Sequence, residues 1–276
     1  MGRLAAAEPT SLWKPPAARD ILCWPLPEQG FVNRLLVRAF ALLARRQVVA
    51  FSGTEHILAE RDPFILVMNH STRTEAVLVP ALLFLLRGGR FIHLIGDWNF
   101  RLVPGLGLIY RRSGAVTVTR KPARPRILNL LKPLYAQATP AFEQARAHLS
   151  HGRSIGIFPE GTVNRDPGRL LHGHAGAARL SLDAGVPIVP AGIRFPGLLP
   201  GQRIGDRAAM EVHIGAPLRP LPSRSAVATA REVRAWHAAI MREIARLSGK
   251  AWNSAGGEKN RGIDPAHSPE VSHEPG

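Results

Sequence analysis

The chain has 276 residues, 45% of them hydrophobic, and a formal net charge of +16, which allow one substantial globular domain of mixed type. A single cysteine, Cys23, excludes an intramolecular disulfide, and two tyrosines without an aromatic–basic pattern argue against a nucleic-acid partner. The charge favours an anionic membrane surface or a phosphorylated substrate, although an arginine-rich codon bias explains it equally well.

Residues 1–29 predict an irregular lead, because they contain several prolines and charges and no apolar run. The next segment, Gly30–Arg46, predicts a helix with Arg34, Arg38 and Arg45 on one face, opposite a wide apolar face. Such a helix can lie in the headgroup plane of a membrane, or it can pack on its own domain. The longest uncharged apolar run is far short of the roughly 20 residues that cross a bilayer.

Downstream, strand and helix patterns alternate, which predicts an α/β fold with a mixed, mainly parallel sheet covered by helices. The predicted strands are Phe64–Met68, Arg90–Ile95, Ala115–Thr119, Ser154–Phe158, Pro187–Ile193 and Met210–Ile214. The predicted helices are Glu75–Leu86, a proline-interrupted region Arg126–Leu149, Ala175–Ala184 and Ala226–Leu247. We expect a single domain over residues 30–248. Residues 249–276, rich in glycine, proline, serine and charge, predict a disordered tail.

The first candidate site is NHSTRTEA, Asn69–Ala76, at the junction of a predicted strand and a predicted helix. His70 and Glu75 are five positions apart, so on a continuous helix they would differ by about 140° and would not share a face. A turn between them lets them meet. A carboxylate bonded to one ring nitrogen of a histidine stabilises the imidazolium, which equips the other nitrogen to deprotonate a substrate hydroxyl. The alternative is structural, since Thr72 and Glu75 also match a capping box.

The second candidate site is IFPEGTVNR, Ile157–Arg165, which also follows a predicted strand. A glycine after a buried strand, here Gly161, lets backbone N–H groups approach an anion closely. The Thr162 hydroxyl can add a hydrogen bond, and Arg165 lies just beyond. The alternative is an ordinary polar turn that contains a glycine.

Four sequence blocks, in this order, closely resemble the glycerolipid acyltransferase family. This is the lysophospholipid acyltransferase group that includes the 1-acylglycerol-3-phosphate acyltransferases. The blocks are Asn69–Glu75, Gly114–Arg120 (GAVTVTR), Phe158–Thr162 (FPEGT) and Val186–Ile193 (VPIVPAGI). The resemblance covers roughly residues 50–215 of the chain.

The resemblance implies a role for each matched block. His70 would be the general base and Glu75 its orienting carboxylate, in an H-x4-E motif. The acceptor would be held, usually through its phosphate, by four residues of the second and third blocks: Arg120, Glu160, Gly161 and Thr162. The fourth block would shape the acyl side of the site.

The implied reaction is O-acyl transfer to a lysophospholipid-like acceptor, 1-acylglycerol-3-phosphate, in phospholipid biosynthesis at the cytoplasmic face of the cell membrane. Acyl-CoA or acyl-carrier protein would be the co-substrate, with no metal, no other cofactor and no acyl-enzyme intermediate. His172 and His174 lack a nearby carboxylate cluster and do not predict a metal site. Three alternatives stay open: a phosphate-free acceptor such as a lyso-amino-acid lipid, a non-catalytic membrane-binding module, and a hydrolase that activates water.

Two residues depart from the family pattern. Glu75 stands where the family usually has aspartate, so the carboxylate is one methylene longer but keeps its charge. Val163 stands where the family often has arginine, so an acceptor phosphate loses one expected partner. Since residues two apart in an extended segment point to the same side, Arg165 is predicted to restore that guanidinium.

Overall fold

The computed structural model describes residues 12–102, 106–118, 122, 126–135, 139–199, 201–221 and 228–253. Within them, seven strands form one sheet in the order β1-β7-β6-β2-β5-β3-β4. Neighbouring strands are parallel, except that β6 and β7 are antiparallel. The strands are β1 (Val48–Ser52), β2 (Ile65–Met68), β3 (His93–Asp97), β4 (Val116–Val118), β5 (Ile155–Ile157), β6 (Ile188–Arg194) and β7 (Met210–Ile214). The predicted mixed, mainly parallel sheet is confirmed.

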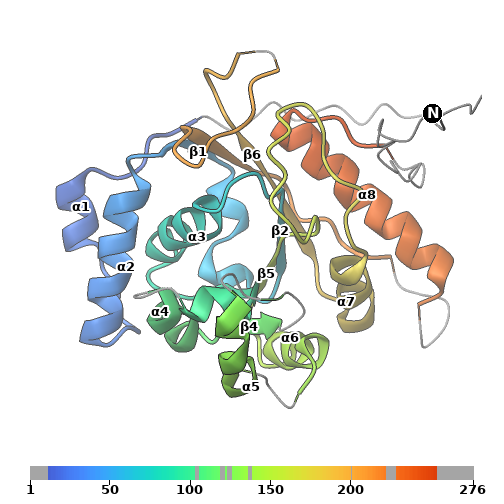
Figure 1. Cartoon of the computed structure of the whole chain (residues 1–276), viewed down its shortest axis with the longest axis horizontal. Helices are drawn as coiled ribbons and strands as arrows, with labels where there is room; N and C mark the ends of the chain where they lie inside the picture. The colour runs from blue at the N-terminus through green and yellow to red at the C-terminus, as the bar shows by residue number, and fades with distance from the viewer. Residues whose placement is uncertain are drawn as a thin grey trace, which may run out of the picture.

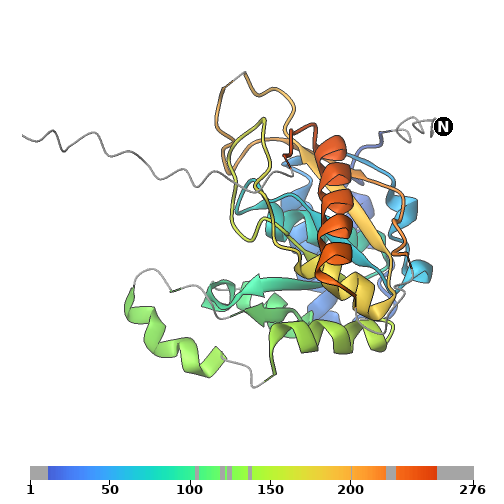
Figure 2. The same ribbon diagram turned by 90° about the vertical axis from the view of Figure 1, so that its right-hand side faces the viewer.

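Helices cover both faces of this sheet (Figure 1). α2 and α3 pack on one face, and α6, α7 and α8 pack on the other. The α-helices are α1 (Ala18–Cys23), α2 (Phe31–Ala44), α3 (Glu75–Leu86), α4 (Leu106–Arg112), α5 (Lys132–Tyr135), α6 (Ala141–Ser150), α7 (Gly176–Ala184) and α8 (Ala230–Ser248). The short 3-10 helices are η1 (Thr54–His56), η2 (Ala59–Arg61), η3 (Trp98–Leu102) and η4 (Arg126–Leu131). η4 and α5 extend away from the sheet (Figure 2).

The alternation of side chains along each strand divides the interior into two cores. In β2, Leu66 and Met68 face the core under α2 and α3, whereas Ile65 and Val67 face the core under α6, α7 and α8. Because both faces are covered, this strand has no polar side, which is typical of central parallel strands. α3 is apolar all round for the same reason, since it is buried between α2 and the sheet.

The N-terminal lead contains structure that the sequence does not predict. α1 lies within it, and Trp13 exchanges two backbone hydrogen bonds with Phe51 in β1. Their rings also stack, with centroids 5.2 Å apart. β1 and α4 are likewise absent from the predicted elements. The prediction of an irregular lead is therefore wrong for α1 and Trp13, which are held by contacts with distant parts of the chain.

The C-terminal boundary also differs from the prediction of a disordered tail from residue 249. Gly249 ends α8 in the left-handed conformation, and Lys250 is buried. Ala251 pairs with the loop around Arg169 through two backbone hydrogen bonds, one of them to Leu170. Residues 249–253 therefore belong to the folded body. Residues 254–276 lie outside the described part of the chain, and the tail stays a prediction there.

Candidate active site

Both candidate loops lie at one edge of the sheet. β2 and β5 are neighbouring parallel strands, so the segments that follow them emerge side by side at their carboxyl ends. Two hydrogen bonds join the loops directly. The backbone N–H of His70 donates to Glu160 Oε1 at 2.9 Å, and the N–H of Asn164 donates to the His70 carbonyl oxygen at 2.7 Å. The loop after β2 and the loop after β5 therefore form one continuous site at the carboxyl ends of these central strands.

His70 and Glu75 form the contact that their spacing predicts. His70 Nδ1 lies 2.9 Å from Glu75 Oε1, and the buried carboxylate also accepts from the Ser71 N–H and the Thr72 hydroxyl. Because an ionised carboxylate only accepts, Nδ1 carries the proton and the lone pair is on Nε2. His70 lines a cleft at this edge of the sheet, with its ring tilted against Phe158 at a centroid distance of 4.6 Å.

The turn before α3 does not form the predicted capping box. α3 begins at Glu75 with Thr74 as its N-cap, and Thr74 makes no side-chain capping bond, although the Thr72 hydroxyl accepts the Glu75 N–H at 3.1 Å. The same turn directs the carboxylate at the imidazole. Burial raises the pKa of Glu75, while the bonds from His70, Thr72 and Ser71 oppose that rise. A fully buried acid held against a histidine is typical of a functional pair rather than of a simple helix cap.

Asn69 positions His70, and the sequence interpretation missed it. Its amide is fully buried, donates to the Ile193 carbonyl at 3.1 Å and accepts the Ile193 N–H at 2.7 Å. A buried amide directly after an all-apolar strand must find backbone partners, so the sequence did contain a hint. The fourth block, Val186–Ile193, is therefore the support for the catalytic loop. It lines neither the cleft nor the apolar pocket described below, contrary to its expected role on the acyl side.

Glu160 is placed differently from the expectation that it binds the acceptor. Besides the His70 N–H, its carboxylate accepts from Asn164 Nδ2 at 2.8 Å and from the Leu171 N–H at 2.9 Å. It is only 4% exposed and does not line the cleft. These three donors, two of them from outside its own loop, engage both carboxylate oxygens, so Glu160 clamps the loops together.

The rest of the EGT loop does face the cleft. Gly161 and Thr162 line it, and Gly161 has φ +66°, a conformation that favours glycine. Val163 lines it too and offers no donor. Arg120 lies outside the described residues, so its expected contact with an acceptor phosphate stays a prediction.

Arginines give the described part of the cleft its positive charge. Arg165 reaches it, as its spacing from Val163 predicts, but its guanidinium donates to the Ile204 carbonyl at 2.6 Å and to Asp206 at 2.7 Å. Arg73 and Arg203 also line the cleft, and the sequence interpretation assigned neither of them. Three arginines and one carboxylate, Asp97, thus line the described part of the cleft, and Asp206 holds Arg165 from beside it.

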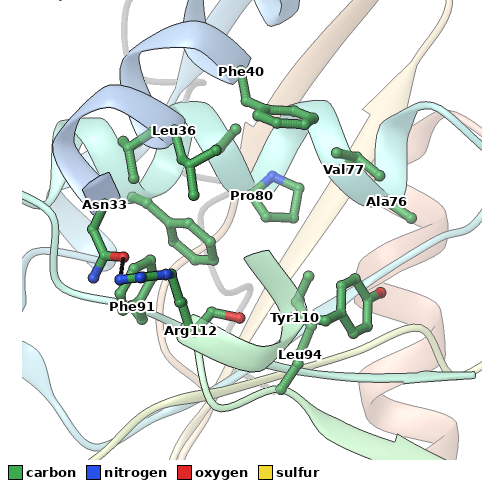
Figure 3. Close-up of a pocket in the computed structure, with 15 residues that line it drawn as sticks. Asn33, Leu36, Phe40, Ala76, Val77, Pro80, Phe91, Leu94, Tyr110 and Arg112 are labelled. Atoms are coloured by element: carbon green, nitrogen blue, oxygen red, sulfur yellow. Dashed lines mark hydrogen bonds between the residues drawn. The ribbon is translucent and has the colours of Figure 1, made fainter. Parts of the chain in front are cut away.

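A narrow apolar pocket adjoins the cleft (Figure 3). Ala76, Leu94 and Tyr110 line both spaces, so the two are neighbours at the start of α3. The pocket runs between α2 and α3, where Leu36 and Phe40 face α3. Its walls are almost entirely apolar, and its volume of about 40 Å³ has room for only a short part of a hydrocarbon chain.

A second serine–histidine–carboxylate arrangement lies at the β1–β7 edge. Ser52 Oγ is 3.1 Å from His213 Nδ1, and His213 Nε2 is 3.3 Å from Glu211. Ser52 and His213 are 4% and 5% exposed, and neither lines the cleft or the apolar pocket. A nucleophilic serine must be reached by its substrate, so this arrangement is a buried structural network and not a hydrolase site.

The histidines of LHGHAG take part in packing. The His172 ring lies against Trp252 with centroids 6.1 Å apart, and its carbonyl oxygen faces His237 Nε2 at 3.2 Å. Within the described ranges, no group of three or more histidine, cysteine or acidic side chains could hold a metal ion.

Comparisons with known proteins agree with this geometry. Residues 48–194, more than half of the chain, match the Acyltransferase family. No curated protein matches the chain significantly. The fold is similar to the crystal structure of the 1-acyl-sn-glycerophosphate (LPA) acyltransferase PlsC from Thermotoga maritima, with 21% identity and a TM-score of 0.52 over 79% of this chain and 82% of that chain. The chain belongs to the Acyltransferase family and is an acyltransferase.

Proposed function

We propose that the enzyme transfers a fatty acyl group from acyl-CoA or acyl-carrier protein to 1-acylglycerol-3-phosphate in phospholipid biosynthesis. The observation that carries this proposal is the position of the His70–Glu75 pair where an arginine-lined cleft meets an apolar pocket. The cleft suits an anionic headgroup, and the pocket offers apolar walls to part of an acyl chain. The base lines the cleft, and Ala76, next to Glu75, lines both spaces.

In the proposed mechanism, His70 Nε2 takes the proton of the acceptor hydroxyl as its oxygen attacks the thioester carbonyl. The Glu75 carboxylate on Nδ1 stabilises the imidazolium that forms. Collapse of the tetrahedral intermediate expels the thiolate, which takes the proton back from the imidazolium. The products are the doubly acylated lipid and a free thiol. The reaction needs no acyl-enzyme intermediate, metal or further cofactor.

Arg165→Ala tests the acceptor. We expect kcat/KM for 1-acylglycerol-3-phosphate to fall about tenfold, because one charge-assisted hydrogen bond to phosphate is lost while other arginines remain. Activity on a phosphate-free lysolipid should stay unchanged. Steady-state rates with both acceptors and acyl-CoA measure this. Arg146→Ala, an exposed arginine on α6, is the matched control.

The same assay separates the alternatives. Equal or better use of a phosphate-free lysolipid by the wild-type enzyme would favour an acceptor such as a lyso-amino-acid lipid. Release of free fatty acid, without acylated product, would indicate that His70 activates water.

We also propose that the enzyme binds peripherally at the cytoplasmic face of the cell membrane. None of the described helices is long and apolar enough to span a bilayer. α2 buries Val37 against the core but exposes Phe31 (81%) and Leu35 (59%). Two arginines of the predicted basic stripe, Arg34 and Arg38, donate to backbone carbonyls of the N-terminal segment. The exposed apolar residues are therefore the better candidates for membrane contact.

The double variant Phe31→Ser/Leu35→Ser should bind anionic phospholipid vesicles about a hundredfold more weakly, since burying each side chain contributes about 1.5–3 kcal/mol. Vesicle sedimentation measures this. Leu199→Ser, which alters a side chain that is 71% exposed in another loop, is the control. A double variant that sediments like the wild type would show that α2 is not the anchor.

A further inference from the structure

Lys250 reaches the catalytic loop from the far end of the chain. It follows α8 directly and is 5% exposed. Its ammonium donates to Ser71 Oγ at 2.8 Å and to the Asp166 carbonyl oxygen at 2.8 Å. Ser71 is the residue between His70 and the turn into α3, and its N–H donates to Glu75. Lys250 thus contacts the loop from behind, because it does not line the substrate cleft.

Backbone contacts on both sides hold Lys250 in place. A Cβ at Gly192 in β6 would lie 2.2 Å from the Leu247 carbonyl carbon, so glycine allows α8 to end directly against the sheet. Gly249 then turns the chain inward with φ +70°. On the other side, the Ala251 N–H donates to the backbone of the loop that follows the EGT segment, at 2.7 Å. These contacts on both sides of Lys250 fix its buried ammonium behind the catalytic loop.

Charges from several elements surround His70. Glu75 and Glu160 contact His70, and Lys250 lies behind Ser71. The ionisable residues that share the cleft with His70 are Arg73, Asp97, Tyr110, Arg165 and Arg203, and Asp206 is bonded to Arg165 and to the Arg73 N–H. Arg165 and Asp206 are paired with each other, so they largely cancel. Two buried carboxylates, Glu75 and Glu160, remain behind the ring. In general, negative charge beside an imidazole favours its protonated form.

Lys250 interacts with those carboxylates. Burial lowers its pKa, and attraction to Glu160, Glu75 and Asp166 acts in the opposite direction. Within the described residues, Lys250 forms no salt bridge with these three carboxylates, and its ammonium donates instead to a hydroxyl and a carbonyl. Because it is paired with none of them, its positive charge acts on Glu75, Glu160 and Asp166 together.

We infer that Lys250 is a positioning residue of the active site, which holds the Ser71 hydroxyl behind the catalytic turn and offsets one of the two buried carboxylates. Its positive charge opposes that of the two carboxylates beside the base, and a general base must be unprotonated to act. This inference rests on the proposed general-base role of His70.

The test compares Lys250→Gln with Lys250→Arg in the full-length protein. Glutamine keeps a hydrogen-bond donor but removes the charge, whereas arginine keeps the charge. The rate of acylation of 1-acylglycerol-3-phosphate by acyl-CoA is measured against pH. In Lys250→Gln, the acidic limb of kcat/KM should move up by about one pH unit, which lowers activity below the limb about tenfold. In Lys250→Arg, the limb should stay in place.

If the acidic limb of kcat/KM in Lys250→Gln stays at the wild-type pH and only the plateau is lower, Lys250 has a structural role alone. That result would overturn the inference. If Lys250→Gln does not fold, Lys250→Arg decides, because a moved limb despite the retained charge would also overturn it. His70→Ala in the same assay keeps the two proposals apart. Full activity of that variant would contradict the general base itself, whatever the Lys250 variants do.

Discussion

Replacing His70 with alanine should lower kcat about 10³-fold, because the acceptor hydroxyl loses the group that takes its proton. The fold should survive, since the loop is held by backbone bonds that the substitution leaves in place. The His70 N–H donates to Glu160, and its carbonyl accepts from Asn164. Steady-state acylation rates measure the loss, and circular dichroism confirms the fold.

His151→Ala is the matched control for this variant. His151 is an exposed histidine just after α6 and lines neither the cleft nor the apolar pocket. It should keep wild-type turnover. Activity within tenfold of wild type in His70→Ala would exclude His70 as the base.

Replacing Glu75 with glutamine should lower kcat about 10²-fold and at the same time raise the melting temperature. The amide can still accept from Nδ1–H, but it carries no charge to stabilise the imidazolium. The gain in stability comes from removing an acid that is costly to ionise when fully buried. Activity and thermal melts are measured on the same preparation.

The pH dependence of this gain follows from the direction of the pKa shift. Burial raises the pKa of Glu75 in the folded state above its ordinary value of 4.5, so the folded state binds the proton more tightly than the unfolded state. Stability from this group is therefore present at low pH and is lost as pH rises through the raised folded value. Glutamine has no such loss, so its advantage in melting temperature should grow from pH 4.5 towards neutrality.

Glu75→Asp is the control that retains the charge, and it should remain active because aspartate is the family's usual residue here. Near-wild-type turnover in Glu75→Gln would mean that Glu75 only caps α3. A melting temperature below that of wild type at neutral pH would mean that the carboxylate stabilises the fold.

The sequence by itself determined most of the strands and helices and the central pair of the site, although it missed α1, β1 and α4. The apolar run of β2 and the apolar run of α3 enclose a short polar segment, so His70 and Glu75 had to lie at a strand-to-helix turn. The EGT loop follows β5 in the same way. These local patterns can be read from the sequence because strands and helices bury apolar side chains at regular intervals along the chain.

Only the tertiary structure decided which polar groups meet substrate and which support it. Glu160 turns away from the cleft because donors from the His70 loop, from Leu171 and from Asn164 of its own loop surround its carboxylate. Arg165 reaches the cleft but is anchored by Asp206. Lys250 stands next to Ser71, although the composition after α8 predicts disorder. Each outcome depends on contacts between segments distant along the chain, and the direction of a buried polar side chain follows from whichever partners the fold brings near it.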